Sequence, residues 1–135
     1  MSREALRAVL EEAKTIAVVG LSPDPERPSN RVASYLRRAG YRILPVNPLH
    51  QTLIGTRCYP DLATAASSER IDIVDVFRRS EFVGPIVDEA IRVKPRLIWL
   101  QVGVVDAEAC ARAEAAGIPC VMDRCLMVDH HEVRG

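Results

Sequence analysis

The residues that follow the first apolar run have the types needed to bind an anion. Gly20 turns the backbone tightly and, having no Cβ, lets a ligand approach the chain closely. Ser29 and Asn30 stand where the next helix is expected to begin, and helix starts attract negative charge through free N–H groups and the helix dipole. Arg27 and Arg31 flank this helix start and can pair with phosphate oxygens. These residues suit a diphosphate, and the alternative is a strand-to-helix turn whose glycine serves geometry alone.

The end of the second apolar run distinguishes between classes of nucleotide ligand. A dinucleotide fingerprint counted from Gly20 needs two further glycines, but Ser22 and Pro25 occupy those positions. NAD-binding domains place an acidic residue after the second strand, where it binds the ribose hydroxyls. This sequence has Asn47 followed by Pro48 at that place. A neutral residue removes the clash with a ribose phosphate, so the sequence favours CoA or NADP over NAD.

The cysteines give no sign of a redox motif. They are Cys58, Cys110, Cys120 and Cys125, and none forms a C-x-x-C pair. Because the cytosol keeps thiols reduced, we expect all four to be free. Cys125 follows the last expected strand, at the edge where a ligand would bind. A mixed disulfide between this thiol and CoA therefore stays open as a hypothesis.

The Cys and His residues near the carboxyl end do not predict a metal site. Cys120, Cys125, His130 and His131 have side chains that zinc accepts, but no second close pair has finger-like spacing. Cys120 also falls in an expected buried strand, where a free cysteine behaves as a small hydrophobe.

Alternating strands and helices must position these residues. Short apolar runs rich in β-branched residues predict strands at 15–19, 42–46, 71–77, 97–101 and 118–122. Helical spacing and capping residues predict helices at about 2–14, 31–39, 62–67, 80–93 and 106–116. Ser29 or Asn30 is expected to cap the second helix. The tail from residue 123 is expected to be irregular or to form a short final helix.

This alternation predicts a Rossmann-like, doubly wound α/β fold. Helices should cover both faces of a five-stranded parallel sheet with the strand order 3-2-1-4-5. Such sheets bind ligands outside the carboxyl ends of their strands, where the strand order reverses. We therefore expect the site among the loops at 20–30, 47–49, 77–79, 101–103 and 123–125.

Size and composition exclude several classes of protein. A chain of 135 residues with 48% hydrophobic residues can form one compact domain, and we expect a single domain over residues 1–135. Acidic and basic residues number 18 each, which argues against nucleic-acid or membrane binding. No apolar run approaches the ~20 residues that span a bilayer, and the first residues lack the apolar core of a signal peptide. A cytoplasmic location is the resulting expectation.

Eight short segments, taken in order, carry a resemblance to a known family. They are VVGLS at 18–22, RPS at 27–29, YL at 35–36, GY at 40–41, PVNP at 45–48, DIVDVFR at 72–78, WLQ-x-G at 99–103 and D-x-C at 123–125. The chain resembles the stand-alone CoA-binding domain proteins. These are similar to the amino-terminal domain of the succinyl-CoA synthetase α subunit and of ADP-forming acyl-CoA synthetases. The ordered set covers nearly the whole chain.

The resemblance implies that CoA lies across the carboxyl ends of the strands. Gly20, Leu21 and Ser22 would contact the phosphates, and Val46, Asn47 and Pro48 would lie beside the adenosine. Phe77, Arg78, Arg79, Gln101 and Gly103 would line the path toward the pantetheine arm. With Arg27, Ser29 and Asn30 from the helix start, these residues form the predicted cofactor site.

The resemblance does not extend to catalysis. In the larger synthetases a phosphorylated histidine and the nucleotide-handling parts belong to later domains, for which 135 residues leave no room. We therefore expect a non-catalytic protein that binds coenzyme A or acyl-CoA, as a monomer or homodimer, with an acyl-CoA enzyme as a candidate partner. The main alternative is a small NAD(P)-binding oxidoreductase or redox-sensing nucleotide-binding domain. A third is an oligomer-forming interaction protein whose cleft is empty.

Overall fold

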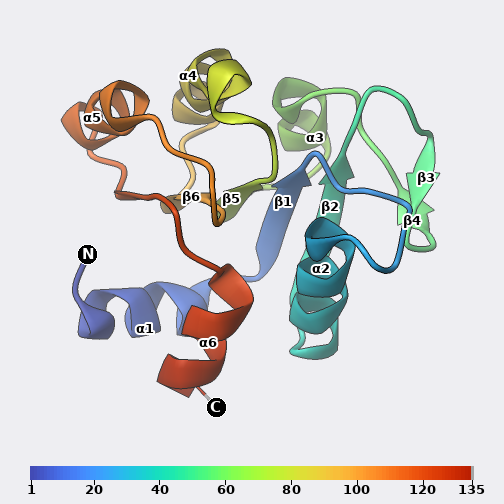
Figure 1. The fold of residues 1–135 in the computed structure, drawn as a ribbon, viewed down its shortest axis with the longest axis horizontal. Helices are drawn as coiled ribbons and strands as arrows, with labels where there is room; N and C mark the ends of the chain where they lie inside the picture. Colours follow the sequence, from blue (N-terminus) through green and yellow to red (C-terminus); the bar gives the residue numbers. More distant parts are fainter. Residues whose placement is uncertain (135) are drawn as a thin grey trace.

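The computed structural model describes residues 1–134 and has a parallel sheet of five short strands at its centre (Figure 1). These strands are β1 (Thr15–Val19), β2 (Arg42–Val46), β5 (Ile73–Val76), β6 (Leu97–Leu100) and β7 (Cys120–Val121). A small antiparallel pair, β3 (Thr52–Leu53) and β4 (Thr56–Arg57), lies on the far side of β2. Every residue of β1, β5 and β6 is buried, as expected for strands covered on both faces.

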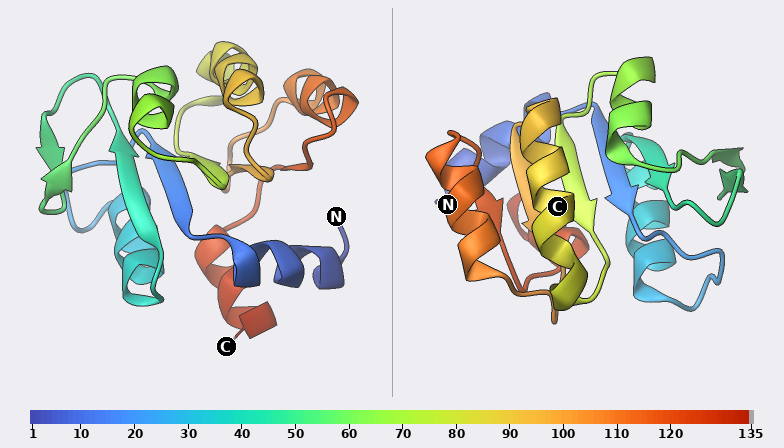
Figure 2. Two further views of the ribbon diagram at one scale, coloured as in Figure 1. Left: turned by 180° about the vertical axis from the view of Figure 1, so that it is seen from behind. Right: turned by 90° about the horizontal axis from the view of Figure 1, so that it is seen from above.

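Six α-helices within residues 1–134 cover the two faces of the sheet (Figures 1 and 2). One layer holds α3 (Leu62–Ser68), α4 (Val83–Val93) and α5 (Ala107–Ala115), and the turn η1 (Ser80–Phe82) precedes α4. The other layer holds α1 (Arg3–Glu12), α2 (Pro28–Arg38) and α6 (Leu126–Arg134). Because side chains alternate along a strand, Ala17 and Val19 enter the core with the first layer, whereas Ile16 and Val18 enter the core with the second.

The doubly wound α/β fold is confirmed, but the predicted strand order is wrong. The sheet runs β2-β1-β5-β6-β7, which is 2-1-3-4-5 along the five strands and not 3-2-1-4-5. The order therefore reverses between β1 and β5. It also makes β2 an edge strand of this sheet. The Pro45 carbonyl accepts the Tyr59 N–H on the side of β2 that faces away from β1. The nitrogen and the carbonyl of one strand residue face the same side, so the Pro45 nitrogen also faces away from β1 and no hydrogen bond between β2 and β1 is lost.

The start of α2 also differs from the prediction. The helix begins at Pro28, with Arg27 as its N-cap residue, and not after Ser29 or Asn30. Proline suits a first helical position because its φ is already helical and its missing N–H is not needed there. Ser29 and Asn30 therefore lie inside the first turn. At the other end of the chain, α6 confirms the expectation of a short final helix.

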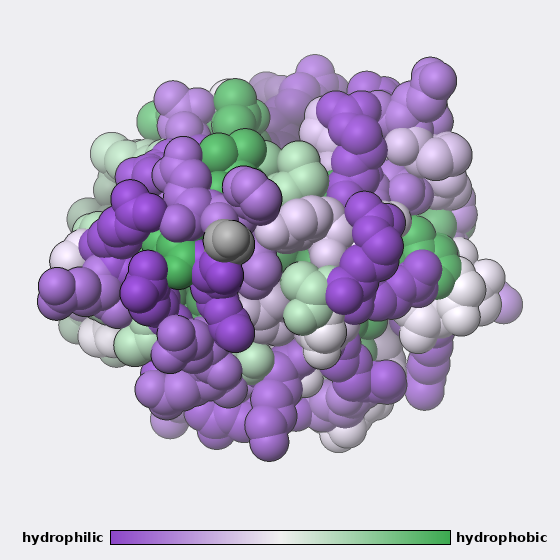
Figure 3. Space-filling model, turned by 90° about the horizontal axis from the view of Figure 1, so that it is seen from below, coloured by the Kyte–Doolittle hydropathy of each residue, from purple (hydrophilic) through white to green (hydrophobic). Residues whose placement is uncertain are grey.

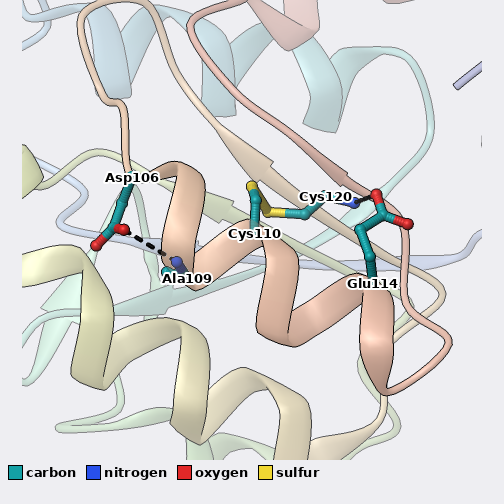
Figure 4. Close-up of a disulfide and its surroundings, with 5 residues drawn as sticks. All are labelled: Asp106, Ala109, Cys110, Glu114 and Cys120. Carbon is teal, nitrogen blue, oxygen red and sulfur yellow. Dashed lines mark hydrogen bonds between the residues drawn. A yellow bond between two sulfur atoms is a disulfide. The ribbon is translucent and has the colours of Figure 1, made fainter.

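A disulfide joins α5 to the edge strand β7 (Figure 4). Cys110 and Cys120 have Cα atoms 5.2 Å apart, within the range that a disulfide bridges. Cys58 and Cys125 are free. The expectation of four reduced thiols is therefore wrong in this structure. Cys110 and Cys120 are ten residues apart in the sequence, and this spacing did not indicate that β7 lies beside α5 in the fold.

Removing this disulfide is expected to destabilise the fold by about 2–3 kcal/mol, because the bond closes a short loop in the unfolded chain. For a domain of this size the loss corresponds to a fall in Tm of roughly 6–10 °C. The measurement is thermal unfolding of the wild type and of the Cys110→Ala, Cys120→Ala double variant, each with and without reductant. The wild type should respond to reductant and the double variant should not. Equal melting temperatures for the wild type in both buffers would contradict the prediction.

No helix within residues 1–134 combines the length and apolar character needed to cross a bilayer. The face that carries α1, α2 and α6 is mainly hydrophilic, with hydrophobic areas that are scattered between polar side chains (Figure 3).

Candidate functional site

A cleft of about 820 Å³ opens at the carboxyl ends of the strands, around the point where the strand order reverses. It is formed by the loops that follow β1, β5, β6 and β7 and by the first turn of α2. Both the place and the size are typical of small-ligand sites in doubly wound sheets.

Part of the cleft lining is strongly basic. Four arginines line it, at Arg27, Arg31, Arg78 and Arg79, and the lining contains no carboxylate. Arg79 lies 3.6 Å from the Glu81 carboxylate at an exposed position. Within residues 1–134, Arg27 and Arg78 take part in no ion pair. A chain with balanced charges thus concentrates positive charge at this edge, which favours an anionic ligand.

Much of the remaining lining is apolar. Phe77 and Met127 face the cleft and also pack against the core that contains α1, α2 and α6. Val102 and Val104 add two aliphatic side chains from the loop after β6. A basic part beside an apolar part suits a ligand that has both an anionic group and an uncharged chain.

Gly20 brings the loops after β1 and β5 into contact. Its φ is +85°, in the left-handed region that side chains other than glycine rarely adopt. A Cβ atom here would lie 2.4 Å from the carbonyl oxygen of Phe77. The Gly20 N–H donates to the Val46 carbonyl at 2.9 Å, which fixes the turn on its other side. Only glycine allows the two loops to form one continuous cleft floor.

The first turn of α2 holds the loop that follows Gly20. The Ser22 N–H donates to Ser29 Oγ at 3.0 Å, and Asn30 Nδ2 donates to the Ser22 carbonyl at 2.9 Å. Ser22 Oγ accepts in turn from the Asp24 N–H at 3.1 Å. These contacts preorganise the loop beside Arg27 without a ligand.

The predicted adenosine segment lies outside the cleft lining. Asn47 Nδ2 donates to the Leu21 carbonyl at 3.1 Å, and its Oδ1 accepts the Leu49 N–H at 2.9 Å. Both ends of the amide are therefore used within the protein. An aspartate could not donate to the Leu21 carbonyl, which gives the neutral residue a structural reason independent of any ribose phosphate. The contact of Val46, Asn47 and Pro48 with a ligand stays a prediction.

The loops after β5, β6 and β7 are tied to one another. The Gly103 N–H donates to Asp123 Oδ1 at 2.8 Å, and the Val105 N–H donates to Ser80 Oγ at 2.9 Å. Gly103 has a φ of +81°, which allows this sharp turn. The three loops therefore form one framework around the apolar part of the cleft.

Helix α6 places Cys125 and Met127 at the cleft. Gln101 Oε1 accepts the N–H of Leu126, the first residue of the helix, at 3.1 Å. Further along, the buried His130 has its Nδ1 2.8 Å from the Tyr35 hydroxyl on α2. Burial lowers the pKa of His130, which favours the neutral imidazole in this contact.

Nine of the predicted site residues line the cleft and five do not. Those that do are Gly20, Ser22, Arg27, Ser29, Phe77, Arg78, Arg79, Gln101 and Gly103. Those outside are Leu21, Asn30, Val46, Asn47 and Pro48, of which Leu21 is fully buried. The lining also includes Pro28, Arg31, Val32, Val102, Val104, Cys125 and Met127, which the predicted set omits. The sequence could have indicated Arg31, which lies at a helix start, and Cys125, which follows a strand. Nothing in the sequence indicated Met127.

The residues considered for a metal site are not brought together. Within residues 1–134, no three His, Cys, Asp or Glu side chains gather closely enough to hold a metal ion. Cys120 is joined to Cys110, and His130 contacts Tyr35.

Comparison with known proteins decides the family of the chain. The sequence pattern of the CoA binding domain matches residues 14–131, a stretch that includes the whole cleft. The chain belongs to the CoA-binding domain family. This CoA-binding domain is 36% identical over 129 residues to the protein YneT of Bacillus subtilis (strain 168), an alignment that covers 96% of this chain and 94% of YneT.

Solved structures show the same fold at several levels of similarity. A Thermus thermophilus protein designated cell-free ID.343 has 44% identity and a TM-score of 0.93, with 98% of this CoA-binding domain and 99% of that chain covered. An acetyl-coenzyme A synthetase from Ca. Korarchaeum cryptofilum has 21% identity and a TM-score of 0.72. That likeness covers 82% of the CoA-binding domain but 26% of the synthetase, and at this identity it shows the fold alone.

Proposed function

We propose that this CoA-binding domain holds coenzyme A in the cleft and catalyses no reaction by itself. The observation that carries the proposal is a lining with four arginines, no carboxylate and an apolar part. CoA matches this lining because phosphates occupy one end of the molecule and an uncharged pantetheine arm forms the other. Membership of the family supports the same class of ligand.

The geometry suggests how CoA would lie. The diphosphate would lie at the Gly20 turn and the first turn of α2, within reach of Arg27 and of Arg78, whose side chain lies against Gly20. The pantetheine arm would then run over Phe77 and Val104 toward Met127. An NAD-type site would instead need an acid for the ribose hydroxyls, and the lining offers none.

A binding role without chemistry also fits the residues at hand. The lining contains no histidine or carboxylate that could act as a general acid or base. The Korarchaeum synthetase carries a similar fold in about a quarter of its chain. We therefore propose that acyl-CoA is bound and released unchanged, and that a separate acyl-CoA enzyme acts on it. Recovery of intact acetyl-CoA after incubation with the protein tests this part.

The proposal predicts selective stabilisation by CoA. At a CoA concentration about 100 times the Kd, the free energy of unfolding should rise by about 2.7 kcal/mol. Thermal unfolding with CoA, NAD, NADH and NADPH at equal concentrations measures the selectivity. We expect Tm to rise with CoA alone. A rise with NADPH but not with CoA would favour the oxidoreductase alternative, and no rise with any of them would support an empty cleft.

The arginines provide the matched variants for this experiment. Arg27→Ala and Arg78→Ala should each weaken CoA binding roughly tenfold or more, because each removes a charge-assisted contact to phosphate. Arg38→Ala is the control, since Arg38 is exposed at the far end of α2 and outside the cleft lining. Equal CoA affinities for all three variants would place the anion elsewhere.

A further inference from the structure

We infer that Cys125 is the residue to which a thiol ligand of the cleft becomes covalently attached by disulfide exchange. This inference rests on the proposed function. Cys125 is half-buried, lines the cleft and directly precedes α6. Within residues 1–134 it has no disulfide partner. Since CoA ends in a thiol, protein and ligand each bring one sulfur atom to the same cleft.

A nearly buried amide beside Cys125 indicates that a ligand group belongs there. Gln101 lines the cleft, is only 4% exposed, and uses its Oε1 to accept the Leu126 N–H. Its Nε2 has no acceptor among residues 1–134, yet it is not one of the side-chain atoms sealed from solvent. Its remaining exposure is therefore to the cleft. A donor in this position gains a hydrogen bond when an oxygen or sulfur atom of a ligand arrives.

The start of α6 adds favourable electrostatics at the same place. The helix has nine residues, and its positive dipole end lies next to Cys125. The species that attacks a disulfide is the thiolate. The start of α6 therefore places positive potential beside the attacking sulfur.

The reaction is an exchange in which CoA disulfide is the co-reactant. The Cys125 thiolate attacks one sulfur of CoA disulfide and forms a Cys125–S–S–CoA bond. The other half leaves as CoA thiolate and takes up the proton that Cys125 lost. Cys125 is oxidised while the disulfide of the co-reactant is reduced, so no other oxidant is needed. Arg27 and Arg78 would hold the nucleotide end during this step.

The test is incubation of the protein with CoA disulfide, followed by intact-mass analysis and peptide mapping. We expect one CoA adduct on Cys125, removable by reductant and absent in Cys125→Ser. Cys58 is the internal control, because it is buried, burial raises the pKa of its thiol, and it should stay unmodified. Bis(2-hydroxyethyl) disulfide, which has no nucleotide, should react with Cys125 at least roughly tenfold more slowly. Arg78→Ala should slow the reaction with CoA disulfide but not the reaction with bis(2-hydroxyethyl) disulfide.

Two outcomes would overturn the inference: no adduct on Cys125, or equal rates with the two disulfides. Thermal stabilisation by reduced CoA is measured in parallel on the wild type and on Cys125→Ser. If CoA stabilises both proteins and no adduct forms, the inference fails and the proposed function stands. If CoA stabilises neither, the proposed function itself fails. Should Cys125→Ser unfold, Cys125→Ala serves as the second variant.

Discussion

Replacing Gly20 with alanine is expected to abolish CoA binding and to lower the free energy of unfolding by at least about 2 kcal/mol. The new Cβ would lie 2.4 Å from the Phe77 carbonyl oxygen, and the φ of +85° is unfavourable for any side chain. The obstacle is backbone and not a flexible side chain, so the loops after β1 and β5 must move apart. That movement would open the floor on which the diphosphate is proposed to lie. Urea unfolding and calorimetric titration with CoA measure the two effects.

Gly40→Ala is the matched control for this prediction. Gly40 has a φ of +108°, but no atom of the described residues lies within 4 Å of the Cβ that alanine would add. This variant should lose about 1 kcal/mol through backbone strain and bind CoA normally. The control therefore separates an unfavourable φ from the contact with Phe77. If both variants lost the same stability and kept CoA affinity, the importance of the close approach would be refuted.

Replacing Asp75 with valine is expected to stabilise the protein at neutral pH. Asp75 lies in the central strand β5 with no solvent exposure, and neither of its carboxyl oxygens has a hydrogen-bond partner in the part of the chain that the structure describes. An unsatisfied buried polar group of this kind costs about 1–3 kcal/mol. Valine fills a similar volume, favours a strand and removes the polar atoms. Urea unfolding at pH 7 should show the gain.

The same variant should change how stability depends on pH. Burial raises the pKa of Asp75 well above its ordinary value, so the folded protein keeps a proton that the unfolded chain releases above pH ~4. Below that pH the folded and unfolded chains both hold the proton, and the titration of Asp75 costs no stability. As pH rises toward the folded-state pKa, the unfolded chain releases the proton and the free energy of unfolding falls. The loss is up to about 1.4 kcal/mol per pH unit. The advantage of Asp75→Val over the wild type should therefore be larger at pH 7 than at pH 5.

Asp72 provides a control of opposite sign. Its Oδ2 accepts the N–H groups of Lys14 and Thr15 at 2.8 and 3.1 Å, so its carboxylate is well satisfied. Asp72→Val should destabilise the protein where Asp75→Val stabilises it. An unchanged pH profile for Asp75→Val would show that the wild-type carboxyl does not keep its proton in the fold.

Most of the elements could be predicted from local sequence, because apolar runs and helical spacing act over a few residues. The strand order could not, since it depends on which way each helical crossover packs. Pro45 carried a usable signal: a residue that cannot donate a sheet hydrogen bond suits an edge strand, and β2 is one. That reasoning would have excluded an order with this strand at the centre.

The residues of the candidate site were predicted best where a single loop supplies several of them. Gly20 and Arg27 follow β1 directly, and both line the cleft. The neutral type of Asn47 predicts a place beside the adenosine, and in the fold its amide joins two loops, so its contact with a ligand stays a prediction. Competition between a ligand and the backbone for one side chain is decided by distances, which a sequence does not contain.

The amino-acid sequence by itself determined an alternating α/β chain, an anion-binding turn and membership of the CoA-binding domain family. Tertiary structure alone decided the strand order, the Cys110–Cys120 disulfide, the burial of Asp75 and the arrival of Met127 at the cleft. The physical reason is range. Local conformation follows from neighbouring residues, whereas these four features depend on packing between segments that are distant in the chain.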